Sequence, residues 1–149
     1  MKHGLILFAH GARDTRWAEP FEAVAARVRA LRPGLLVHNA YLEFMAPTLP
    51  DAGDALAAAG CTQVDVLPLF LGAGGHVRRD LPLLIEALRQ RHPDTAWTLH
   101  TAVGETPSVI EAMALTAIAS LGPQGNVALP LSLIPTGDGR PWPALGRSE

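Results

Sequence analysis

Two histidines follow two strand-like apolar runs, and each lies in a segment of small residues. His10 comes directly after the run 5–9, and His76 follows the run 64–70 and a stretch rich in glycine. In open α/β proteins, ligands bind at the carboxyl ends of the strands. A pair of imidazoles at such an edge can hold a divalent transition metal or act in acid–base chemistry. The pattern therefore predicts a shared site, and the spacing alone leaves both chemistries open.

Other polar residues are expected at the same edge, because the carboxyl ends of parallel strands all lie on one side of a sheet. Glu43 follows the second expected strand, and His100 and Glu105 lie near the end of the fourth. The remaining histidines, His3, His38 and His92, are interpreted as structural.

Arginines and glycines accompany the two histidines. The guanidinium groups of Arg13, Arg78 and Arg79 can bind substrate carboxylates, or they can be solvated or paired with nearby aspartates. Gly74 and Gly75 lack a Cβ and so permit the close approach of a flat ligand. The stretch has neither of the usual nucleotide-binding glycine patterns, which makes a phosphate site a weak interpretation.

Apolar runs alternate with segments of helical periodicity along the chain. Thr48 followed by Asp51 resembles a capping box. The order βαβαβαβα predicts a single doubly wound α/β domain, with a four-stranded parallel sheet flanked by helices. The expected strands are 4–9, 35–41, 64–70 and 97–101, and the expected helices are 17–31, 49–59, 80–91 and 108–121.

Length and composition agree with a compact domain. The chain has 149 residues, of which 48% are apolar and 17% charged. A net charge of −2 gives no global case for nucleic-acid binding. The apolar run near the N-terminus is too short for a signal peptide or a membrane span, so we expect a cytoplasmic protein without a membrane partner. We expect the domain to cover 1–121 and a proline- and glycine-rich tail, disordered or an extended arm, to cover 122–149.

Four segments together resemble the short-form sirohydrochlorin chelatases, a class II group of tetrapyrrole chelatases of cobalamin and sirohaem synthesis. The resemblance covers about residues 4–121, and the order and spacing of the segments make it specific. The segments are Ala9-His10-Gly11-Ala12-Arg13-Asp14, Tyr41-Leu42-Glu43 with Ala46-Pro47-Thr48-Leu49-Pro50, Leu67-Pro68-Leu69-Phe70-Leu71 with Gly75-His76-Val77, and Arg79-Asp80-Leu81-Pro82.

The resemblance implies insertion of Co²⁺ or Fe²⁺ into sirohydrochlorin without ATP. It implies no tightly bound cofactor, because the metal is a substrate, and it implies a homodimer. The family's two metal-binding histidines map onto His10 and His76, and its acidic residue maps onto Glu43. Three positions depart from the family pattern: Ala12 replaces a serine, Ala9 replaces a common glycine, and Thr106 stands where relatives often carry histidine.

Two other functions remain open from the residues. The chain can be a non-catalytic carrier of metal or tetrapyrrole that uses the same histidines. It can also be an ordinary small-molecule α/β enzyme with His10 as its general base. Metal binding without faster insertion would favour the carrier, and activity insensitive to a chelator would favour the other enzyme.

Overall fold

The computed structural model describes residues 1–122, and the chain divides into two compact units. The first unit is Met1–Thr106, and the second begins at Pro107. In chain order the elements are β1 (Lys2–Ala9), the 3-10 helix η1 (Thr15–Ala18), α1 (Glu19–Leu31), β2 (Leu36–Tyr41), α2 (Leu49–Ala58), β3 (Cys61–Pro68), α3 (Gly75–Arg91), β4 (Ala96–Leu99), the 3-10 helix η2 (Val103–Glu105) and α4 (Pro107–Ala119).

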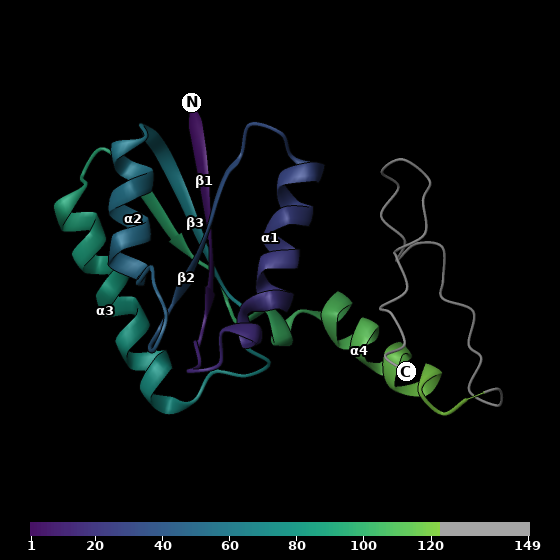
Figure 1. Cartoon of the computed structure of the whole chain (residues 1–149). Coiled ribbons are helices and arrows are strands. Elements are labelled where there is room, and N and C mark those ends of the chain that lie inside the picture. Colours follow the sequence, from purple (N-terminus) through teal and green to yellow (C-terminus); the bar gives the residue numbers. More distant parts are fainter. Residues whose placement is uncertain (123–149) are drawn as a thin grey trace. The chain divides into compact units, whose positions relative to one another are not determined.

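The four strands form one parallel sheet in the order β2-β1-β3-β4. Helices α2 and α3 cover one face of this sheet, and α1 covers the other (Figure 1). Successive side chains of a strand point to opposite faces. On β1, Ile6 and Phe8 therefore pack against α2 and α3, whereas Leu7 packs against α1. The predicted α/β class and parallel sheet are confirmed.

The start of α2 follows the predicted capping box. The Thr48 hydroxyl accepts a hydrogen bond from the Asp51 backbone N–H at 3.3 Å, and the Asp51 carboxylate accepts one from the Thr48 N–H at 3.4 Å. Each bond satisfies a backbone donor that the first helical turn leaves without a partner. This cap fixes where α2 begins, after the loop that carries Glu43.

Helix α3 begins at Gly75 rather than at the predicted Asp80. Val77 lies one turn before Leu81 and packs against the same core cluster, so the apolar face of the helix extends toward its N-terminus. The prediction of a loop at His76 is therefore wrong, because this residue lies in the first turn of α3. Strand β3 likewise covers Cys61–Pro68 instead of 64–70, since β1 begins early and pairs Lys2 with Cys61.

The expected boundary at residue 121 stays a prediction. Of the predicted tail, 122–149, all but Gly122 lies outside the described residues. Within residues 1–122, no helix has the length and apolar character needed to cross a membrane.

Candidate metal centre

The loops after β1 and β2 are joined to each other at the carboxyl edge of the sheet. These strands are neighbours, and their backbone pairing continues past the strand ends. The Leu42 N–H donates to the Ala9 carbonyl, and the Glu43 N–H donates to the His10 carbonyl, both at 3.0 Å. As a result, His10 Nδ1 and Glu43 Oε1 lie 3.4 Å apart, and both side chains are about half exposed. The structure thus brings together two of the predicted site residues.

Gly11 allows the two loops to approach so closely. Its φ is +89°, a left-handed conformation that side chains disfavour. A Cβ at this position would lie 1.9 Å from the Glu43 carbonyl oxygen. The spacing of His10 and Glu43 therefore depends on a glycine between β1 and η1.

An exposed aromatic ring stands beside this pair. Phe44 has a φ of 62° and remains 56% exposed, and the Arg13 guanidinium lies 4.7 Å from the centre of its ring. This is a cation–π contact. Asp14 pairs instead with Arg16, at 3.0 Å, and hydrogen bonds from Arg16 lower the pKa of the Asp14 carboxyl. The sequence did not single out Phe44 as a contact of Arg13, because nothing in the spacing predicts its left-handed backbone.

His76 is held by its own helix. Arg79 donates from Nε to the Gly75 carbonyl at 3.2 Å, and its Nη2 lies 3.4 Å from His76 Nδ1. Within the part of the chain that the structure describes, no group of three or more His, Cys, Asp or Glu side chains is placed to hold a metal ion. The metal-ligand roles predicted for His10 and His76 therefore remain predictions.

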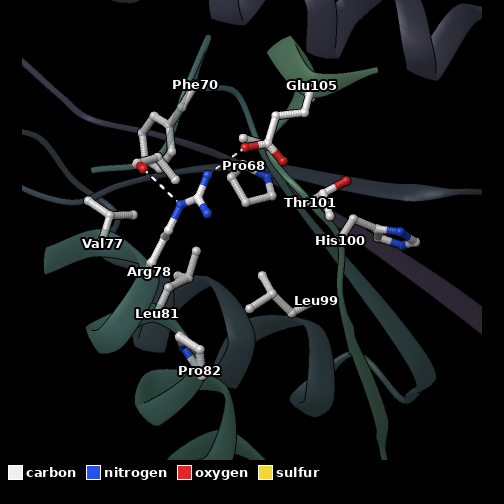
Figure 2. Close-up of a pocket in the computed structure, with 12 residues that line it drawn as sticks. Pro68, Phe70, Val77, Arg78, Leu81, Pro82, Leu99, His100, Thr101 and Glu105 are labelled. Carbon is white, nitrogen blue, oxygen red and sulfur yellow. Dashed lines mark hydrogen bonds and ion pairs between the residues drawn. The ribbon is translucent and has the colours of Figure 1, made fainter. Parts of the chain in front are cut away.

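Arg78 joins two loops of the chain. Its Nε donates to the Ala73 carbonyl and its Nη2 to Glu105 Oε1, both at 2.9 Å. Figure 2 shows this side chain reaching from α3 toward Glu105. Both residues line a cavity of about 200 Å³. Sequence reasoning placed Glu105 at this edge but could not pair it with Arg78, because the two lie far apart in the chain.

A second polar cluster lies on the sheet itself. His3 and His100 both hydrogen-bond to Asp65, on β3, and the His100 contact measures 2.7 Å. Burial raises the pKa of the Asp65 carboxyl, but the hydrogen bonds and the charges of the two histidines together lower the pKa overall. His92 likewise bonds to Asp54 at 2.7 Å, which agrees with the structural interpretation of His3 and His92. Sequence analysis missed this cluster, although a lone aspartate in an apolar strand is a signal that could have indicated it.

The His10–Glu43 pair lies at the carboxyl edge of an open parallel α/β sheet, the edge at which proteins of this architecture bind their ligands. A family model described as CbiX matches residues 4–118. The chain therefore belongs to the CbiX family, and the resemblance drawn from its motifs is confirmed.

Curated relatives carry the same name in several organisms. The chain is 30% identical over 87 residues to sirohydrochlorin cobaltochelatase of Sulfurisphaera tokodaii, and 31% identical over 88 residues to that of Methanocaldococcus jannaschii. These matches cover 58% and 59% of this chain, and 71% and 62% of the two relatives. With the relative from Methanococcus aeolicus, the match spans 57% of the relative's length.

Solved structures share the fold. A putative cobalamin biosynthesis CbiX protein from Marinobacter aquaeolei VT8 has a TM-score of 0.70 and 34% identity, covering 80% of this chain and 97% of that one. The sirohydrochlorin chelatase SirB from Bacillus subtilis subspecies spizizenii, solved with cobalt, has a TM-score of 0.68 and 23% identity. This chain corresponds to 50% of that SirB chain, and the likeness shows a common fold.

Proposed function

We propose that this chain inserts Co²⁺ or Fe²⁺ into sirohydrochlorin without ATP, with the metal ion as a substrate. The observation that carries the proposal is the His10–Glu43 pair, 3.4 Å apart at an exposed edge of the sheet. The names of the relatives support the choice of reaction, since two that are 30% and 31% identical are sirohydrochlorin cobaltochelatases.

Metal insertion requires an ion that the protein holds with few ligands, because a closed four-ligand site would retain it. His10 and His76 supply imidazoles, which suit divalent transition metals, and leave coordination positions open for the nitrogens of the macrocycle. The macrocycle loses two N–H protons as the metal enters. Glu43 lies close enough to His10 to act beside the metal as a general base for one of these protons, and the other passes to the solvent, to which this half-exposed pair is open.

The substrate is a flat ring that carries carboxylates on its rim. Arg13 and Arg79 present planar guanidinium groups that match carboxylate geometry. Phe44, which is 56% exposed, offers an apolar surface to the face of the ring. Gly74 and Gly75 have open space where a side chain would be, so a ring can approach their backbone closely.

Absorbance spectroscopy of anaerobic sirohydrochlorin with Co²⁺ or Fe²⁺ tests the proposal. The wild-type chain should accelerate the spectral change, and His10→Ala and His76→Ala should each return it to the uncatalysed rate with the fold intact by circular dichroism. His38→Ala is the matched control, because this histidine lies on β2 and has no role in the proposal. Full activity in either site variant would overturn the assigned roles.

The same experiment distinguishes the chelatase from the alternative function, a non-catalytic carrier. Binding of metal or macrocycle without any acceleration would mean that the chain is a carrier rather than an enzyme. Light scattering coupled to size-exclusion chromatography tests the homodimer that the family resemblance implies.

A further inference from the structure

The segment between β3 and α3 has few contacts of its own. Gly72, Gly74 and Gly75 have no atom within 4 Å of the place where a Cβ would lie, and Leu71 is 71% exposed. This segment leads directly into the first turn of α3, which carries His76. The packing of Val77 on the core holds the helix itself, so it is the N-terminal end of α3, with His76, that depends on a restraint on the preceding segment.

Two contacts with η2 supply this restraint. At the beginning of the segment, the Gly104 N–H donates to the Phe70 carbonyl at 2.9 Å. A Cβ on Gly104 would lie 2.1 Å from the Leu71 carbonyl oxygen, so the backbone of η2 is in close contact with the segment. Further along, Arg78 bonds to the Ala73 carbonyl and to Glu105, which fastens the middle of the segment to the end of η2.

Arg78 places a positive charge in the first turns of α3. A cation in the first turns of a helix is disfavoured by the helix dipole. Glu105, 2.9 Å away, offsets that cost and at the same time orients the guanidinium toward Ala73. The ion pair is exposed, so its own contribution to stability is small. Its consequence is geometric, because it joins the segment before His76 to a separate loop.

We propose that Arg78 and Glu105 form a positioning pair that holds His76 for metal transfer, and that Arg78 is not primarily a substrate ligand. This inference rests on the proposed function. The two roles of Arg78 predict opposite effects of removing Glu105. If Arg78 binds substrate, loss of Glu105 frees its guanidinium and lowers KM for sirohydrochlorin. If the pair positions His76, the same loss lowers kcat and weakens Co²⁺ binding.

The test compares Glu105→Gln with Glu86→Gln in the full chain. Glu86 pairs with Arg89 on α3 at 3.4 Å, is similarly exposed, and lies away from the segment, which makes it a matched control. We measure amide hydrogen exchange of 71–77 without metal, Co²⁺ affinity by calorimetry, and kcat and KM for sirohydrochlorin. In Glu105→Gln we expect exchange about two- to fivefold faster, the range that an exposed ion pair supports.

The same variant should have a kcat and a Co²⁺ affinity about two- to fivefold lower, since an exposed ion pair can favour the competent position of His76 by no more than its own coupling energy. Its KM should stay within about twofold of wild type, because no substrate contact is removed. Arg78→Lys should lower kcat and Co²⁺ affinity about as much as Glu105→Gln does, since an ammonium group cannot bond to both Ala73 and Glu105 through a planar fork. The Glu86→Gln control should match wild type in every measurement.

Three results would overturn the positioning role. These are unchanged exchange in Glu105→Gln, faster exchange with unchanged kcat and Co²⁺ affinity, and a lower KM with unchanged kcat. Exchange and Co²⁺ affinity require no turnover. A wild-type chain without chelatase activity would therefore refute the proposed function, while these two measurements still decide whether the pair positions His76.

Discussion

Replacing Gly11 by alanine should damage both the fold and the candidate metal centre. Gly11 has a φ of +89°, and an added Cβ would lie 1.9 Å from the Glu43 carbonyl oxygen. The atom it meets belongs to the backbone, so the collision cannot be relieved by rotating a side chain. The loops after β1 and β2 must move apart, and His10 then separates from Glu43.

Two contributions set the stability that Gly11→Ala should lose. A left-handed backbone at a residue with a Cβ costs about 1–2 kcal/mol. Overpacking against fixed neighbours adds about 1–3 kcal/mol. Gly34 separates the two, because its φ is +94° and no atom lies within 4 Å of its Cβ position. Gly34→Ala should therefore show the conformational cost alone, and Gly11→Ala should lose about 2–5 kcal/mol in total.

Urea unfolding of both variants measures this difference as a shift in the transition midpoint. Co²⁺ titration of the same proteins reports the state of the site, and only Gly11→Ala should bind the metal more weakly. If Gly11→Ala were no less stable than Gly34→Ala, the close contact with Glu43 would not exist in solution, and the reasoning would fail.

Three further predictions concern other parts of the fold. Thr48→Ala removes one half of the capping box and should lower the free energy of unfolding by about 1 kcal/mol, measured in urea; no change would refute the cap. Gly74→Ala meets no neighbouring atom and should cost less than about 1 kcal/mol, yet it should raise KM for sirohydrochlorin if a ring approaches this backbone; an unchanged KM would contradict that approach. Asp65→Asn removes the carboxylate that bonds to His3 and His100. Because the pKa of the Asp65 carboxyl is lowered in the folded chain, its ionised form stabilises the fold above about pH 4, the ordinary range of a free aspartate. The stability gap between wild type and this variant should therefore be full at pH 7 and shrink as the pH falls below about 4; a gap that stays constant with pH would refute the linkage.

Much of the fold could be predicted from the sequence, because local signals agree with the tertiary structure. The apolar run of β1 and the capping box at Thr48 both mark their elements correctly. The start of α3 was missed, since glycines at 74 and 75 resemble a loop while Val77 already packs on the core. Local propensity and burial conflict there, and burial determines the helix.

The strand order determines which site residues contact each other, and the sequence does not predict that order. The strand-end rule places His10 and Glu43 at one edge, but their contact requires β1 to neighbour β2. Likewise, Arg78 meets Glu105 because β3 neighbours β4. The handedness of crossovers constrains topology without fixing this order, so the sequence predicts the edge and not the pairs.

The glycines near the site show why residue type alone cannot assign a role. Gly11 and Gly104 are in close contact with backbone atoms of other loops, so a side chain there disturbs the folded chain itself. Gly74 and Gly75 face open space and have no positive φ, so the fold accommodates a side chain. Any large loss of activity in an alanine variant at these two positions must then arise when a ligand approaches the backbone. Measuring stability and activity on the same alanine variants therefore distinguishes glycines that position the site from those that admit the substrate.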